Sequence, residues 1–476
     1  MKKYYIICSL SVLGLASCTK DISSFNEQTK LAAQVPAATL FTNGVRNLSD
    51  VLASPNVNRN VSRLIVQQWA TTTYPDEPNY DFTTRNIPQT FWTILYRDVI
   101  ANVKESKRLI PNDITITEDV KKNRLAIADI MEVYTYSILV NTFGDVPYNE
   151  AIDASVTFPK YDDAKTIYED LLKRVDADIA ALNTSAAGFT AVQDIVYGGN
   201  ITKWKKFANA LKIRLAMTYA DVDAAKAKTA FEQADAGAFA ASADNASITY
   251  FSATPNNNPI WADLIQSKRQ DYVAGETILN KMNALSDPRV PQYFKPNDAG
   301  VYVGGKAGAL NTYSLFAKPG AKLEDPALPA LLLSYDEIEF YRAEAKERGF
   351  TVTGSAEEHY NNAIKASIVY WGGTTAQADA YLLQPGVSYL TATGDWKEKI
   401  GTQKWIAFYN RTIDTWTDVR RLDYPKLPAP AAARSGFPNR LTYPTNEQTL
   451  NGANYTSAAA KIGGDKVETK IFWDKF

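Results

Sequence analysis

The sequence predicts a mainly α-helical protein, in which a helical scaffold carries a loop-rich lobe and a few short strands. Apolar residues recur near the helical period of about 3.6 residues in several long segments. Ser-x-x-Glu capping boxes mark two helix starts, at Ser334 and Ser355. The intervening segments are long and rich in Asn, Gly, Pro, Thr and Tyr, at residues 70–90, 240–275, 290–330 and 425–465.

The N-terminus carries the features of a bacterial lipoprotein signal. A basic start is followed by the apolar stretch Tyr4–Gly14, which is too short to span a bilayer. Leu15-Ala16-Ser17-Cys18 then matches the lipobox, in which the cysteine is lipidated and the chain is cut before it. The alternative is an ordinary signal peptide with a chance cysteine. We therefore expect a signal peptide at 1–17, a lipidated tether at 18–35 and one helical domain at 36–476.

Helical spacing predicts a series of helices in the first half of the chain. The first covers Pro88–Leu109. A second begins after Thr117 with a charged turn and runs to about Phe143. Asp162 opens a third, and apolar residues across Trp204–Tyr219 mark a fourth.

The second half contains the clearest helix pair. Ser334 begins one helix, Gly349 lies just past its end, and Ser355 begins the next. Two such helices joined by a short turn form a hairpin of roughly tetratricopeptide size. We expect a similar pair from the helix ending at Phe143 and the one opening at Asp162. The scaffold is therefore predicted to consist of tetratricopeptide-type hairpins.

Composition excludes several classes of function. The formal charge is −1, and loss of Lys2 and Lys3 with the signal makes it −3, so nothing favours nucleic acid. Of the two cysteines, Cys8 leaves with the signal and Cys18 is the anchor. The only histidine, His359, is expected on the surface of a helix. The mature chain thus lacks the ligands of a zinc site, and we predict no cofactor and no metal.

Several short segments, each weak alone, occur in a recognisable order behind the lipobox. Together they resemble the SusD/RagB family of outer-membrane nutrient-binding lipoproteins, and more narrowly its SusD-like type 2 branch. The segments are Asn141–Tyr148, Trp204–Ala216, Ser286–Arg289, Leu333–Glu337, Ala343–Ala345, Gln403–Ala407, Asp418–Arg421, Tyr424-Pro425, Arg440–Pro444 and Phe472–Asp474.

The resemblance implies a fold with tetratricopeptide-type hairpins on one face and loops on the other. It also implies a non-catalytic lid that binds an oligosaccharide or peptide and delivers it to a SusC-type TonB-dependent transporter. Thr19-Lys20-Asp21 resembles the export signal of such lipoproteins. We therefore expect an outer-membrane location, with the protein held by lipid alone and facing the exterior.

The recognisable motifs themselves are expected to serve the scaffold. Gly144–Pro147 has the residues of a helix stop, and Asp287-Pro288-Arg289 those of a turn. Arg420 and Arg421 are expected to pair with buried carboxylates or carbonyls.

Ligand contacts are expected on the variable loops, since a rigid scaffold frees loops to vary. The first candidate loop runs from Trp69 to Arg85 and the second from Asn256 to Tyr272. Trp69 and Trp92 border helices and are expected in the core. The predicted contacts are Tyr74, Asn79, Tyr80, Arg85, Asn257 and Trp261.

Other functions stay open at this stage. Two carboxylates suffice for a glycoside hydrolase, although no acid/nucleophile motif and no regular strand–helix alternation is present. A mainly structural lid with little affinity of its own is a further alternative. Glycan and peptide ligands both suit aromatic-lined sites with polar edges, so the sequence does not choose between them.

Overall fold

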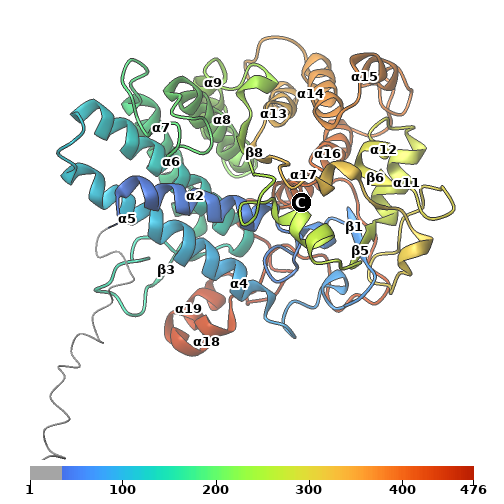
Figure 1. Ribbon diagram of the computed structural model, residues 1–476, viewed down its shortest axis with the longest axis horizontal. Coiled ribbons are helices and arrows are strands. Elements are labelled where there is room, and N and C mark those ends of the chain that lie inside the picture. The colour runs from blue at the N-terminus through green and yellow to red at the C-terminus, as the bar shows by residue number, and fades with distance from the viewer. Residues whose placement is uncertain (1–34) are drawn as a thin grey trace, which may run out of the picture. The chain divides into compact units, whose positions relative to one another are not determined.

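Helices, six of them paired in three hairpins, form the framework of residues 35–476, the part of the chain that the computed structural model describes (Figure 1). The predicted mainly α-helical fold is confirmed. Residues Ala37–Phe476 form one compact unit, and over the described range no helix is long and apolar enough to cross a membrane. Cys18, the predicted signal peptide and the tether up to residue 34 lie outside the described residues.

Three hairpins form the scaffold, and each pairs a helix with its successor in the chain. Gly144 ends the helix Glu118–Phe143, as predicted, with a φ of 83° that glycine adopts readily. Asp163 caps the second helix, one residue after the predicted start at Asp162. The hairpins are α6 (Glu118–Phe143) with α7 (Ala164–Ala181), α8 (Ile201–Tyr219) with α9 (Ala224–Asp235), and α13 (Tyr335–Glu347) with α14 (Ala356–Trp371).

Neither predicted capping box is complete, but one of the two serines does cap its helix. The Ser355 hydroxyl accepts a hydrogen bond from the Glu358 amide at 3.1 Å and caps α14. The Ser334 hydroxyl does not cap α13, so that prediction is wrong. It is occupied instead by Arg411, whose Nη1 donates to it at 2.5 Å, and by Asp336. The buried guanidinium of Arg411, the residue before α17, thus takes the place of the local backbone at this hydroxyl.

The predicted helix at Pro88–Leu109 is confirmed as one continuous helical run with a π-helical centre. It packs against α2, which opens the described unit. These elements are α2 (Ala37–Ala53), α4 (Ile87–Thr93), the π-helical η3 (Ile94–Ile100) and α5 (Ala101–Leu109).

The few short strands that the sequence predicts form antiparallel two-stranded sheets. One of them pairs Trp69 with Ala274 and Thr71 with Tyr272. The pairs are β1 (Trp69–Thr71) with β5 (Tyr272–Ala274), β2 (Val146–Pro147) with β3 (Tyr161–Asp162), β4 (Ala246–Ile248) with β8 (Ala330–Leu333), and β6 (Phe294–Lys295) with β7 (Lys318–Pro319).

The remaining helices are mostly short. Two of them lie within 425–465, where the sequence indicated only a loop, because their few apolar residues carry little periodic signal. They are α3 (Ser62–Ile65), α10 (Pro259–Trp261), α11 (Glu276–Ala284), α12 (Val290–Tyr293), α15 (Thr375–Leu382), α16 (Trp396–Ala407), α17 (Thr412–Leu422), α18 (Thr445–Leu450) and α19 (Gly452–Lys461). Single turns are η2 (Glu77–Asn79), η4 (Ile110–Asn112), η5 (Ser242–Asp244), the π-helical η6 (Ala262–Gln266), η7 (Tyr313–Leu315) and η8 (Ala321–Glu324).

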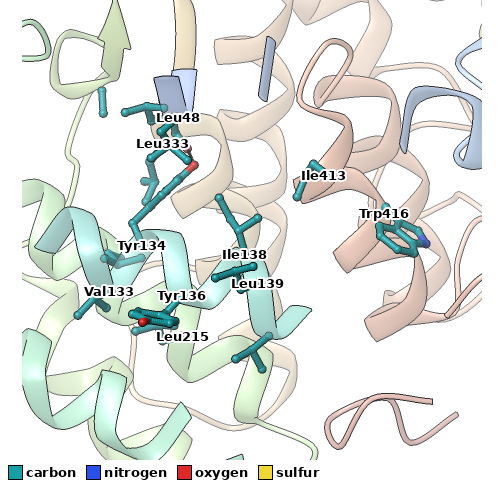
Figure 2. Close-up of a cluster of buried hydrophobic side chains, with 14 of the residues drawn as sticks. Leu48, Val133, Tyr134, Tyr136, Ile138, Leu139, Leu215, Leu333, Ile413 and Trp416 are labelled. Carbon is teal, nitrogen blue, oxygen red and sulfur yellow. Dashed lines mark hydrogen bonds between the residues drawn. The ribbon is translucent and has the colours of Figure 1, made fainter. Parts of the chain in front are cut away.

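A continuous core joins segments from both ends of the chain. Figure 2 shows Leu48 of α2, Leu139 of α6 and Trp416 of α17 in one buried cluster. The buried Tyr134 hydroxyl, also in this cluster, donates to the Leu332 carbonyl at 2.7 Å, so its polar atom is satisfied. Trp69 and Trp92 belong to the same core, as predicted.

Buried ion pairs hold the recognisable motifs in place. Arg421 donates to both oxygens of Glu344, and Arg420 donates to backbone carbonyls. Asp287 and Arg289 form a completely buried pair at 2.6 Å within their turn. The predicted scaffold role of these motifs is confirmed.

His359 departs from its predicted surface position, because its side of α14 faces α13. The ring is buried, with Nδ1 2.9 Å from Glu339 Oε2 and Nε2 2.6 Å from the Thr353 carbonyl. Both ring nitrogens therefore have partners within the protein.

Candidate functional site

The two candidate loops meet at one cavity. Pairing of β1 with β5 brings the chain after Thr71 beside the chain before Tyr272. The cavity between them has a volume of about 230 Å³. It is lined by Asn56, Val57, Asn58, Thr71, Thr73, Tyr74, Glu77, Arg85, Asp263, Arg269, Asp271 and Tyr272.

Tyr74 is the exposed aromatic of this cavity, with 52% of its surface accessible. Its backbone is left-handed, with a φ of 54°. The ring centroid is 5.0 Å from Arg85 Cζ and 5.9 Å from Arg269 Cζ. The two cations hold the ring in place, and its exposed part can contact an apolar sugar face.

Both guanidinium groups that line the cavity are already paired. Arg85 Nε donates to Glu77 Oε1 at 2.6 Å, and Arg269 Nε donates to Asp271 Oδ2 at 2.5 Å. The Thr73 hydroxyl donates to the other Asp271 oxygen at 3.3 Å. The positive charges of Arg85 and Arg269 are thus compensated before a ligand arrives.

The cavity wall contains buried polar atoms without partners among residues 35–476. These are Oε2 of the fully buried Glu77, Oγ1 of Thr71 and Nη2 of Arg85, none of which has a hydrogen-bond partner. Burial raises the pKa of Asp263, the third carboxyl group of the cavity. Buried polar atoms without a partner cost free energy, but these atoms are closed to solvent, so a ligand in the cavity meets the accessible side chains instead.

Asn79 and Tyr80 lie in the interior behind the cavity. The Asn79 amide nitrogen donates to the Pro75 and Gly308 carbonyls, each at 2.8 Å, and its oxygen accepts from the Ala432 amide at 2.9 Å. Tyr80 is buried. Both side chains shape the first loop, whereas Tyr74 and Arg85 line the cavity.

The predicted contacts of the second loop also lie outside the cavity lining. Asn257 is buried and donates to the Phe251 carbonyl at 2.7 Å. Trp261 is half-buried on α10. The structure thus brings together Tyr74 and Arg85 of the predicted set, and it does not bring Asn257 or Trp261 to them.

Sequence reasoning missed several lining residues, above all Asp263 and Asp271. Arg269 and Asp271 stand two residues apart in extended chain before β5, so they share one side. This pair of charged residues two positions apart, next to an aromatic loop, was the sequence signal that could have indicated them as lining residues. The pairing of β1 with β5 is a contact between distant segments, which no local pattern predicts.

A second cavity lies between α14 and the start of α17, with walls that include Trp371, Tyr409 and Arg411. Its volume of about 40 Å³ holds only a few water molecules, at about 10–15 Å³ each. It is too small for a sugar ring. The cavity at Tyr74 is the candidate site because it is lined by residues of both candidate loops.

The SusD-like_2 family, described as "Starch-binding associating with outer membrane", matches residues 28–444. The chain belongs to this family. A comparison with curated proteins finds no match.

Solved structures of the SusD type share the fold over nearly the whole chain. A chitin-binding protein is 26% identical, with a TM-score of 0.79 over 92% of this chain and 100% of that one. A chitin-binding SusD homolog from Flavobacterium johnsoniae is 25% identical, with a TM-score of 0.79 over 92% and 98%. A SusD homolog from Bacteroides uniformis is 25% identical, with a TM-score of 0.76 over 92% and 99%.

Membership of the SusD-like family explains which motifs were recognisable. Those motifs build buried contacts such as Arg421 with Glu344 and Asp287 with Arg289. The Tyr74 cavity lies on loops that none of the motifs contains. Family recognition therefore identifies the scaffold, and the ligand must be inferred from the cavity.

Proposed function

We propose that this protein is a lipid-anchored, cell-surface subunit that binds an oligosaccharide and delivers it, without hydrolysis, to a SusC-type TonB-dependent transporter in the outer membrane. The observation that carries the proposal is the cavity of about 230 Å³ in which the exposed Tyr74 ring stands among carboxyl and hydroxyl side chains. An aromatic face with nearby hydroxyl acceptors matches the two sides of a sugar ring. The chitin-binding relatives, at 25–26% identity, support a carbohydrate ligand.

Charge favours a neutral glycan. An acidic sugar needs a free cation, but Arg85 and Arg269 are committed to Glu77 and Asp271. The remaining carboxyl group, Asp263, would repel an acidic ligand when it is ionised. A neutral oligosaccharide avoids both costs.

Calorimetry on the lipidated full chain tests this proposal. The ligands are neutral oligomers of glucose and of N-acetylglucosamine, and an acidic oligogalacturonate. We expect binding to at least one neutral oligomer, none to the acidic oligomer, and no release of reducing sugar. Failure to bind any glycan, with the transporter present or absent, would contradict the proposal, and product release would contradict its non-catalytic part.

The transporter partnership has its own test. Deletion of the gene should reduce uptake of the bound oligomer and leave its extracellular hydrolysis intact. Unchanged uptake of that oligomer would contradict delivery to a transporter, even if binding in solution were measured.

A further inference from the structure

Another cavity lies at the end of α17, apart from the candidate site. Its volume is about 260 Å³, compared with about 230 Å³ for the cavity at Tyr74. Its lining comes from three segments, 419–427, 437–439 and 470–476, and shares no residue with the lining of the Tyr74 cavity. We call it the Phe437 cavity.

Two aromatic rings form part of the wall of the Phe437 cavity. Phe476 is 51% exposed, about as much as Tyr74, and Lys397 Nζ lies 3.1 Å from its ring centroid. Phe437 is half-buried, and its ring packs edge-on against that of Tyr80, with the centroids 6.2 Å apart. Neighbouring side chains thus hold both rings, and part of each ring remains exposed for contact with an apolar sugar face.

Asn439 places a free acceptor in the same wall. Its backbone carbonyl accepts from Arg420 Nη1 at 2.6 Å, and its side-chain Nδ2 donates to the Glu468 carbonyl at 3.0 Å. The remaining side-chain atom, Oδ1, has no hydrogen-bond partner among residues 35–476 and is not closed to solvent. Because the residue is fixed at two points, Oδ1 can accept a ligand hydroxyl without a rearrangement of the protein.

The accessible charges of the cavity are matched in pairs. Lys426 Nζ pairs with the Asp423 carboxylate, and Lys470 Nζ lies 3.4 Å from Asp474 Oδ1. The Arg420 guanidinium is buried and donates to backbone carbonyls. Because the two lysines and Asp423 remain exposed, the cavity offers polar groups to a ligand without an accessible unpaired charge.

We infer that the Phe437 cavity is a second oligosaccharide-binding site, which takes a neutral sugar. This inference rests on the neutral glycan ligand of the proposed function and adds a site for it. Exposed aromatic surface, a free amide oxygen and paired charges suit a ligand that has an apolar face, several hydroxyl groups and no net charge. A charged peptide would have to break the lysine–carboxylate pairs, and a wholly apolar ligand would cover Asn439 Oδ1 and leave it unpaired.

The first candidate loop connects the two cavities. Tyr74 lines one of them, and Tyr80 packs against Phe437 of the other. Between these two tyrosines, the Asn79 carbonyl accepts from the Arg434 amide at 2.7 Å, which ties the loop to the segment before Phe437. A polymeric glycan that occupies both sites is retained more firmly than at one site, because release from either leaves it held at the other.

The number of oligomers bound by the lipidated full chain tests this inference. Calorimetry with neutral oligomers of glucose and of N-acetylglucosamine should give two bound oligomers per protein for at least one of these ligands. Tyr74→Ala should weaken only one of the two binding events, and Phe437→Ala should weaken the other about tenfold. Phe476→Ala, whose ring is exposed, provides the same test if Phe437→Ala fails to fold. Phe251→Ala, which removes an exposed aromatic outside both linings, is the matched control.

The outcomes separate the inference from the proposed function. A single bound oligomer that only Tyr74→Ala weakens overturns the second site and leaves the proposed function intact. A single bound oligomer that only the Phe437 and Phe476 variants weaken supports the Phe437 cavity and overturns Tyr74 as the site. The absence of binding to any oligomer overturns both, and equal weakening in Phe251→Ala overturns the assignment to the Phe437 cavity. Far-UV circular dichroism of each variant verifies its fold.

Discussion

Glu344 of α13 accepts two hydrogen bonds from the guanidinium of Arg421 on α17, at 2.5 and 2.7 Å. Both side chains are almost wholly buried. Burial alone would raise the Glu344 pKa, but the charges of Arg421 and Arg348 outweigh burial and hold that pKa at about 2. This pair couples the α13–α14 hairpin to the helix that carries the late sequence motif.

Replacement of Glu344 by Gln should destabilise the protein by about 3 kcal/mol at pH 7, because it leaves the Arg421 charge buried with less compensation. The folded pKa lies below the ordinary glutamate value of about 4.3, so this stabilisation is present above that value and is lost as pH falls toward 2. Urea unfolding at pH 7 and pH 3 measures both effects. Glu347→Gln, on the exposed side of α13, is the control. An equal loss of stability in that variant would refute the buried pair of Glu344 and Arg421 as the cause.

Asp178 of α7 should oppose folding at neutral pH. Burial, together with the neighbouring Asp129 carboxylate, raises its pKa to about 9. The folded state therefore holds a proton that the unfolded state releases above about pH 4, and stability falls between these two pH values.

Asp178→Asn should remove this pH dependence and stabilise the protein, by up to about 1.4 kcal/mol for each pH unit across that window. Thermal unfolding at pH 5, 7 and 9 measures the gain, which should grow with pH. The exposed Asp379→Asn variant of α15 should show no such trend. A gain that stays constant with pH would contradict the buried protonated carboxyl group.

The Tyr74 ring should contribute to glycan binding as a stacking platform. Tyr74→Ala should weaken the affinity for a neutral oligosaccharide about tenfold, whereas Tyr74→Phe should retain most of it, since the ring face carries the contact. Calorimetry measures the dissociation constants. The control is Phe251→Ala, which removes an exposed aromatic outside the cavity lining; equal weakening there would argue against the Tyr74 cavity as the site.

His359 should titrate above its ordinary pKa of about 6.5. Burial lowers the pKa, but hydrogen bonds to Glu339 and the Thr353 carbonyl outweigh burial and raise it. The stabilisation is therefore complete below about pH 6.5 and is lost as pH rises through the folded value. A proton NMR titration follows this single histidine without assignment, and Glu339→Gln should lower its pKa. A pKa at or below the ordinary value in the wild type would contradict the pairing.

Periodicity predicted the long helices well because each buries one face over many turns. The run from Pro88 to Leu109 and helix α6 were located this way. The same method missed α18 and α19, whose short sequences carry little periodic signal. It also assigned Ser334 to a cap, although a distant guanidinium on Arg411 occupies that hydroxyl.

Within the candidate site, residue type alone did not distinguish the side chains that line the cavity from the buried ones. Tyr74 and Tyr80 are six residues apart in one loop, yet one is exposed and the other buried. The backbone is left-handed at both positions, so the difference depends on packing against distant segments of the chain. Local sequence does not encode those contacts in a readable form.

The sequence by itself determined the helical class, the hairpin scaffold, the family and the expectation of a lipid anchor at Cys18. These follow from local periodicity, capping residues and ordered motifs. Only the tertiary structure decided that β1 pairs with β5 and that Tyr74 joins Glu77 and Asp263 at one cavity. The physical reason is that these sites are made by contacts between segments far apart in the chain, whose register depends on the whole core.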